Sequence, residues 1–267
     1  IAGKLNTVNH YCDSKPGIVT AANNFFIVNE ETEKLYNLSE FVKPIIQKGF
    51  FVNGSVVFDK KEFKQIVSEG KPSKVLCISD EKVAELPLTV RNYLKIGVDL
   101  ELPDRYKCSK RNNWFVVPNI SIPPDGFFFR RIHHYPKLLK NKAKVLVTDT
   151  AYKIEMRSGY KINSLIYSFY NSLSLTFAEL SGRYYGGGVL ELTPQEFKNI
   201  PVPNVKVSQT VFEKYTAAFE KKEDITEILD NFDLQILNAS LGLNKEEIER
   251  IKSIYGKLVS KRFRKKS

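Results

Sequence analysis

The chain has 267 residues, and its 41 Lys and Arg against 30 Asp and Glu give a net charge of +11. Hydrophobic residues make up 42% and aromatic residues 12%, which supports a folded core and excludes a disordered chain. No apolar run approaches the roughly 18 residues of a membrane-spanning helix, and three widely spaced cysteines indicate a reduced, cytoplasmic protein.

Short strands and two helices are predicted in the first hundred residues. Residues 16–28, PGIVTAANNFFIV, indicate two short strands joined by an Asn-rich turn. Residues 61–69 predict a helix that stops at a Gly-Lys-Pro breaker, and residues 74–78 predict a buried strand. Residues 86–96 predict a second helix, which ends before Gly97.

Strand patterns dominate the middle of the chain. They occur at 114–118 (WFVVP), 127–129 (FFF), 143–149 (AKVLVTD) and 152–156 (YKIEM), with prolines between them. Residues 161–180 then place apolar side chains at helical spacing and predict one long helix.

The last third is helical. Residues 208–220, 224–240 and 244–263 predict three helices, with Gly242 ending the second and Asn244 and Glu247 forming a capping box for the third. The basic tail KRFRKKS reads as frayed and solvated. We therefore expect a mixed α/β (α+β) fold, with an irregular twisted sheet body over residues 1–206 and a C-terminal helical subdomain over residues 207–267.

The positive charge is concentrated in residues 105–163. This segment holds 13 basic and three acidic residues, a local net charge of 13 − 3 = +10, so the other residues sum to +1. Concentrated positive charge attracts polyanions, of which nucleic acid is the commonest. A solvated basic surface without a specific partner is the alternative.

Two segments combine cations with aromatic residues. RYKCSKRNNWFVVP at 105–118 places four cations beside Trp114 and Phe115, which suits phosphate contacts and guanine readout by arginine, with the aromatic residues serving as core. In the segment at 171–203 a helix ends at Gly182, and Arg183, two tyrosines and three glycines follow. Arg183 is a candidate base reader, and pairing with Glu179 one turn earlier is the alternative.

Catalytic motifs are absent from the sequence. It contains no Walker loop, GxGxxG, CxxC or GxSxG, and the adjacent His133 and His134 would face opposite ways on a strand. We expect no catalytic, cofactor-binding or metal-binding residue in this chain. A metal-dependent nuclease that uses scattered acids, and an interaction module for an acidic partner, remain alternatives.

Three motifs together resemble the C-terminal target-recognition region of bacterial adenine-N6 DNA methyltransferases of restriction–modification systems. They are PGIVTAANNFFIV, RYKCSKRNNWFVVP and ELSGRYYGGGVLELTPQEFKNIPVP, over about residues 1–206. Two positions depart from the family pattern: Ala21 stands where a glycine is usual, and Tyr152 stands where many relatives have histidine.

The resemblance implies a chain that binds double-stranded DNA as a monomer and does not methylate it. The family's Asn/Asp-Pro-Pro-aromatic loop is missing, since the Pro-Pro pair at 123–124 lacks both the amide and the aromatic residue. S-adenosylmethionine and methyl transfer would belong to an N-terminal domain of the parent chain, which could also carry an endonuclease. The residues expected to bind DNA are Arg105, Lys107, Lys110, Arg111, Arg130, Arg131, Arg183, Tyr184, Tyr185, Gly186, Gly187 and Gly188.

Overall fold

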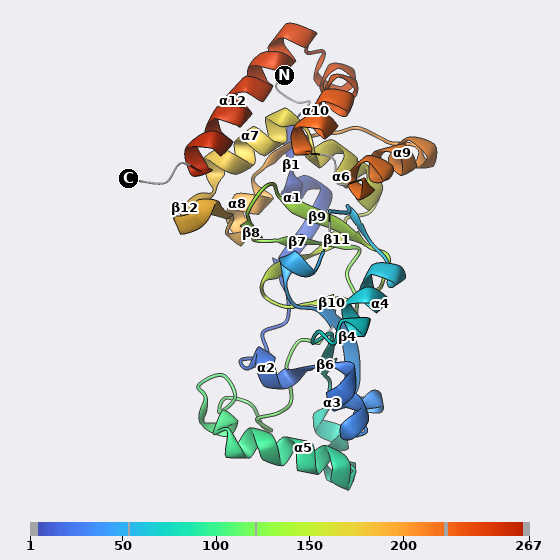
Figure 1. The fold of residues 1–267 in the computed structure, drawn as a ribbon, viewed down its shortest axis with the longest axis vertical. Helices are drawn as coiled ribbons and strands as arrows, with labels where there is room; N and C mark the ends of the chain where they lie inside the picture. The colour runs from blue at the N-terminus through green and yellow to red at the C-terminus, as the bar shows by residue number, and fades with distance from the viewer. Residues whose placement is uncertain (1–4, 53, 121, 222–223, 264–267) are drawn as a thin grey trace.

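The computed structural model describes residues 5–52, 54–120, 122–221 and 224–263. The molecule is elongated, with helices gathered at one end, the largest sheet in the middle and a smaller α/β unit at the other end (Figure 1). The helices and the sheets together confirm the predicted mixed α/β fold. In the described part of the chain, no helix has the length and apolar character needed to cross a bilayer.

The central sheet has five strands in the order β2-β11-β7-β9-β5. Its strands are β2 (Cys12–Pro16), β5 (Val57–Phe58), β7 (Gly126–Phe129), β9 (Lys137–Asn141) and β11 (Ala151–Met156). Successive side chains of a strand point to opposite faces, and here both faces are covered. Phe128 therefore packs into the cluster beneath the helices, while Phe127 and Phe129 pack into a second cluster on the other face.

The smaller α/β unit is built on a four-stranded sheet, ordered β10-β4-β6-β3. Its strands are β3 (Ile27–Val28), β4 (Val42–Ile46), β6 (Lys74–Leu76) and β10 (Leu146–Val147). Three α-helices and three 3₁₀ turns surround them: α2 (Asn23–Phe26), α3 (Glu30–Leu35), α5 (Leu88–Asp99), η1 (Ser39–Phe41), η3 (Asp80–Glu85) and η4 (Leu102–Asp104). The chain enters this unit at Gly17, where a side chain would collide with the main chain of Val147 and Thr148.

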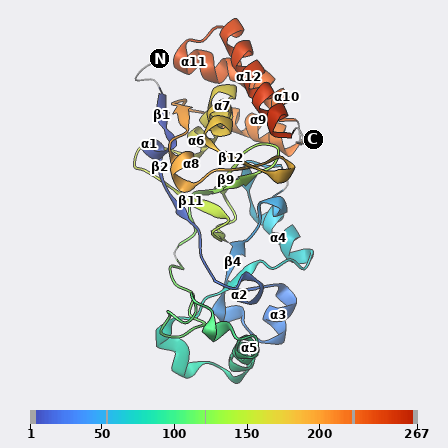
Figure 2. The same ribbon diagram turned by 90° about the vertical axis from the view of Figure 1, so that its left-hand side faces the viewer.

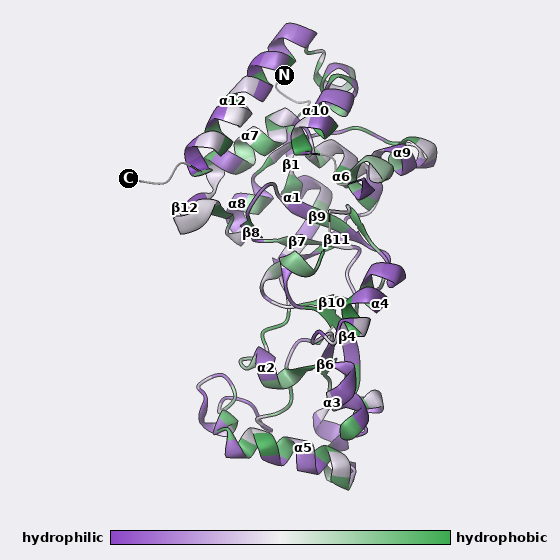
Figure 3. Cartoon of the chain, viewed as in Figure 1, coloured by the Kyte–Doolittle hydropathy of each residue, from purple (hydrophilic) through white to green (hydrophobic). Residues whose placement is uncertain are grey.

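The helical end packs against the upper face of the central sheet (Figure 2). Its elements are α6 (Ile162–Phe169), α7 (Ser172–Ser181), α9 (Gln209–Glu220), α10 (Ile225–Asp233), the π-helical turn η6 (Leu234–Asn238), α11 (Ala239–Leu241) and α12 (Lys245–Phe263). Further short elements are α1 (Val8–Tyr11), α4 (Lys60–Ser68), α8 (Pro194–Lys198), β1 (Leu5–Thr7) and its partner β14 (Pro201–Pro203). Figure 3 shows hydrophobic residues along the central strands and hydrophilic stretches on the outer helices.

The residues after 206 share a hydrophobic cluster with the sheet body. Phe212 and Tyr215 of α9 are buried together with Phe128 and Tyr152 of the sheet. Tyr152, at the position where the family resemblance led us to expect histidine, is a core residue. Its hydroxyl donates to the carbonyl of Leu192 at 2.6 Å.

Residues 161–180 form two helices rather than the one predicted. The break falls at Asn171, whose buried side chain accepts from Ser174 N at 2.9 Å and caps α7. The spacing of apolar residues gives no sign of the break, because both helices bury apolar side chains in the same cluster.

The prediction of two strands over residues 16–28 is also wrong in part. Residues 23–26 form the helical turn α2, because the Thr20 side chain hydrogen-bonds Asn23 and Ala22, and Ala21 adopts φ +71°. That left-handed conformation is one that favours glycine, the residue that the family resemblance led us to expect at this position.

The predicted strand at 114–118 is an irregular segment, and the helix predicted to stop before Gly97 continues to Asp99. One contact accounts for both differences. The Trp114 ring lies on Gly97, and a Cβ placed there would be 2.1 Å from the ring. Glycine is needed for this close approach and does not end the helix.

Replacing Gly97 by alanine should therefore destabilise the protein by about 1–3 kcal/mol, because the added methyl group overpacks the Trp114 contact. Gly256→Ala is the matched control: it lies in α12 with no neighbour near its Cβ position, and it should stabilise by about 0.5–1 kcal/mol. Urea unfolding measures both. Equal effects of the two substitutions would contradict the packing role of Gly97.

Candidate nucleic-acid interface

A three-stranded sheet beside the helical end gathers several of the predicted DNA-binding residues. It comprises β12 (Arg183–Tyr185), β13 (Val189–Glu191) and β8 (Arg131–Ile132), in the order β12-β13-β8. Arg183 pairs with Glu191, which pairs with Arg131, so these three side chains share one face. The opposite face buries Leu190 and Ile132.

Glutamates orient the arginines of this sheet. Arg131 donates from Nε to Glu191 at 2.8 Å, Arg130 lies 3.6 Å from the same carboxylate, and Arg183 Nε lies 3.3 Å from Glu196. Arg183 therefore does not pair with Glu179. The side chains of Arg131 and Arg183 remain 67% and 65% exposed, and Tyr185 of the same strand is also exposed. Arg131 and Arg183 contact these carboxylates through Nε, and among the described residues their terminal nitrogens have no carboxylate partner.

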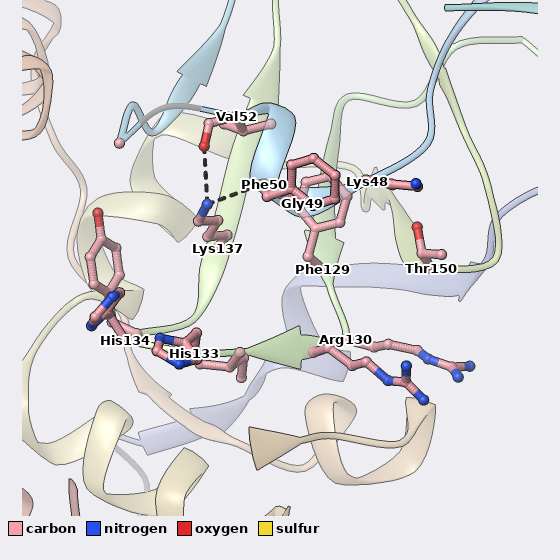
Figure 4. Close-up of a pocket in the computed structure, with 14 residues that line it drawn as sticks. Lys48, Gly49, Phe50, Val52, Phe129, Arg130, His133, His134, Lys137 and Thr150 are labelled. Atoms are coloured by element: carbon pink, nitrogen blue, oxygen red, sulfur yellow. Dashed lines mark hydrogen bonds between the residues drawn. The ribbon is translucent and has the colours of Figure 1, made fainter. Parts of the chain in front are cut away.

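A cavity of about 650 Å³ opens beside this sheet (Figure 4). Six of its described lining residues are basic or histidine, and none is acidic: Lys48, Arg130, Arg131, His133, His134 and Lys137. Glu191, which pairs with Arg130 and Arg131, lies outside this lining, so the wall presents cations and no carboxylate, and such a wall is suited to an anion such as a phosphate group.

Lys137 is the exception among these cations, because its charge serves the protein itself. Its Nζ donates to the carbonyls of Gly49 and Val52 at 2.9 and 3.0 Å (Figure 4). Burial lowers the pKa of Lys137. Lys137 thus holds the turn η2 (Gly49–Phe51) on the edge of the cavity.

The histidine pair follows β8 and does not face opposite ways, contrary to the prediction. The rings of His133 and His134 lie 4.6 Å apart, and the ring of His134 stacks on Phe263 of α12. Burial and the charges of His133 and Arg262 lower the pKa of His134, so its ring is neutral at pH 7. No cluster of three potential metal ligands occurs among the described residues.

Arg262 of α12 holds the surroundings of this sheet together. It is buried and forms a two-pronged pair with Glu179 of α7 at 2.9 and 3.0 Å. The same guanidinium donates to the carbonyls of His133, His134 and Gly188. This part of the basic tail is therefore not solvated as predicted, and the prediction for residues 264–267 lies outside the described residues.

The three glycines after β12 differ in their surroundings. Gly186, Gly187 and Gly188 form the turn η5, and the last two have φ +74°. A Cβ on Gly188 would be 2.6 Å from the Phe263 ring, whereas Cβ positions on Gly186 and Gly187 meet nothing within 4 Å. Gly188 is thus required by packing, and Gly186 and Gly187 leave open space in front of the main chain. Tyr184, by contrast, turns back and donates to the carbonyl of Glu179.

The other predicted cations lie in the smaller α/β unit, on the loop after η4. Arg105, Lys107 and Lys110 are exposed, whereas Arg111 donates to the carbonyls of Trp114 and Thr20. Burial lowers the pKa of Arg111. Arg111 therefore anchors the loop through its guanidinium, and the other three cations face solvent.

Two groups of predicted residues thus lie at different heights of one side of the molecule. In Figure 1 the loop after α5 and the strand β12 project from the same long side, which Figure 2 turns toward the viewer.

Sequence reasoning missed Lys48 and Phe50, which no motif contains, and set aside His133 and His134. The signal for Lys48 and Phe50 was only a cation beside a Gly-Phe-Phe run.

Substituting Arg262 with alanine should destabilise the protein by about 3–5 kcal/mol at about pH 7.5, because it leaves the Glu179 carboxylate buried without its partner. Burial already raises the pKa of Glu179 and Arg262 opposes that shift, so the pKa rises further in the variant. The deficit relative to wild type should shrink as the pH falls toward about 5, because the raised pKa lets the buried carboxyl of the variant take up a proton more readily. Arg250→Ala, which removes an exposed pair with Glu246, should cost at most about 0.5 kcal/mol. Urea unfolding at both pH values checks this, and a deficit that does not vary with pH would speak against a buried charge.

Comparison with known proteins identifies the family. The family model of the C-terminal domain of the type II methyltransferase M.Eco57I matches residues 2–237. No curated protein matches the sequence. The fold is similar to that of the type IIG restriction endonuclease BpuSI, with a TM-score of 0.58 and 12% identity over 98% of this chain and 32% of that chain. The type IIL restriction-modification enzyme MmeI, solved in complex with DNA, matches at a TM-score of 0.49 and 9% identity over 93% of this chain and 36% of that chain. The chain spans about a third of the length of both enzymes.

The family match confirms the resemblance to a C-terminal region of restriction–modification methyltransferases: the protein belongs to the family of the M.Eco57I C-terminal domain.

Proposed function

We propose that this chain binds double-stranded DNA and reads its sequence as the target-recognition part of a restriction–modification methyltransferase that acts on adenine N6. The observation that carries the proposal is the acid-free cationic cavity beside the arginines of the β12-β13-β8 sheet. Membership of the methyltransferase C-terminal family supports the same function. Nothing in the described residues favours a nuclease or a module for an acidic partner.

The two kinds of cation suit two tasks. Lysine is a flexible point charge, and Lys48, Lys107 and Lys110 fit contacts to phosphate, which position a duplex without reading it. Arg131 and Arg183 are held through Nε by carboxylates, so their planar ends are presented in a fixed orientation. A fixed guanidinium fork matches the O6 and N7 acceptors of guanine in the major groove.

The chemistry of methyl transfer would belong to another domain of the parent protein. This chain contains neither the Asn/Asp-Pro-Pro-aromatic loop nor a Gly-rich loop for S-adenosylmethionine. The parent domain would bind that cofactor and take the adenine out of the duplex, while this chain holds and reads the flanking base pairs. We place the protein in the cytoplasm as a monomer that contacts DNA and its own methyltransferase domain.

The chain should bind a short mixed-sequence duplex with strong salt dependence. If about six phosphates are neutralised, the log–log slope should be near −5, because each phosphate contributes about −0.9. Fluorescence anisotropy between about 50 and 200 mM salt measures the slope. A slope near zero would contradict binding to the DNA backbone.

Arg131→Ala and Arg183→Ala should each lower discrimination between a target duplex and its scrambled counterpart by about 1–3 kcal/mol, because each removes a fixed base contact. The target is first selected from a randomised duplex pool. Lys107→Ala is the control: it should weaken both duplexes alike and flatten the salt slope by about one. The proposal that these arginines read bases is wrong if the ratio of the dissociation constants for the target and scrambled duplexes is the same in the variants as in the wild-type chain.

A further inference from the structure

Phe50 is the most exposed aromatic residue on the described wall of the cationic cavity. Its side chain is 71% exposed, and it lies on the turn η2, which Figure 3 shows as a hydrophobic turn beside β7. Single exposed apolar residues are ordinary in proteins, so exposure alone assigns no role. The support beneath Phe50 is what sets it apart.

The turn that carries Phe50 is fixed from below by a half-buried cation. Lys137 donates to the carbonyls on both sides of Phe50, those of Gly49 and Val52 (Figure 4). Gly49 packs on the Phe129 ring, where a Cβ would be 3.0 Å from the nearest ring atom. Val52 is buried and closes the turn. These contacts hold the main chain of the turn in place, and the turn presents the Phe50 ring to solvent.

On the side of the cationic cavity, the surroundings of the ring are positive: Lys48 Nζ lies 5.4 Å from the centre of the Phe50 ring, and no described residue that lines this cavity is acidic. On its other side Phe50 borders a second cavity of about 990 Å³ with mixed charge, whose lining includes Asp59, Glu62 and Lys71. The ring of Phe51 meets Phe50 edge-on at 4.7 Å and supports it from one side. A protein partner would require a wider apolar patch around the ring, whereas a nucleobase brings phosphates that match the flanking charge.

We propose that Phe50 stacks on, or wedges between, bases of the DNA bound at this surface, with Lys48 on a neighbouring phosphate. The inference rests on the proposed function and names the ring through which the site contacts bases. Aromatic stacking on a base contributes roughly 1–3 kcal/mol, and apolar wedges of this kind unstack and kink a duplex. Phe50 would then act without any sequence-reading hydrogen bond.

Affinity and salt dependence separate stacking from charge. Phe50→Ala should weaken binding of a mixed-sequence duplex by about 5- to 150-fold, the fold-change that corresponds to about 1–3 kcal/mol for one stacked base. The salt slope should stay unchanged, because no charge is removed. Leu35→Ala on α3, a substitution of an equally exposed side chain, should bind as wild type does.

A tryptophan at the same position reports stacking directly. Unlabelled duplex should quench the emission of Phe50→Trp and leave the emission of Leu35→Trp unchanged, with the wild-type chain supplying the background from Trp114. The stacking role is overturned if Phe50→Ala binds duplex as tightly as the wild-type chain, or if Phe50→Trp binds duplex without quenching. Either result is expected if the ring contacts a protein surface instead. The proposed function survives that outcome if the wild-type chain binds duplex with a steep salt slope. Loss of all duplex binding by the wild-type chain overturns both proposals.

Discussion

The buried pair between Arg262 and Glu179 is the contact on which the proposed DNA surface depends. Arg262 lies in the last turn of α12. Its guanidinium donates hydrogen bonds to Glu179 and also to the carbonyls of His133, His134 and Gly188. One side chain thereby joins α7, α12, the end of β8 and the turn after β12. A buried charge tolerates little displacement, because any loss of its partners leaves it desolvated. The pair therefore fixes the position of β12 and β8 relative to the helices.

A second constraint is the division of cations between structural and exposed roles. Lys137 and Arg111 donate to main-chain carbonyls and stabilise turns, whereas Arg131, Arg183 and Lys48 remain at the surface. Residues that looked equivalent in the sequence thus perform different tasks. The structural cations shape the turns from which Phe50 and the basic loop project. The exposed cations give the surface the field that attracts a polyanion.

Local signals made much of the fold predictable. The predicted capping box at Asn244 and Glu247 forms, the structure contains a second one at Thr193 and Glu196, and Gly242 ends its helix with φ +76°. Each of these features depends on groups three or four residues apart, so the sequence contains the whole interaction. The triple-phenylalanine strand was likewise predictable, since a run of apolar residues suits a sheet covered on both faces.

The gathering of the candidate site was decided by the tertiary structure alone. Glu179 and Arg262 are 83 residues apart, and Lys137 reaches back 88 residues to the turn below Phe50. Gly97 lies inside its helix, and the ring of Trp114 from a later segment packs on it. The sequence by itself determined the charge of the chain, the helix ends that depend on local caps and the motifs that indicate the family. Which cations would be buried, which arginines would share one face and which phenylalanine would stay exposed depended on contacts between distant segments, and no local pattern encodes those contacts.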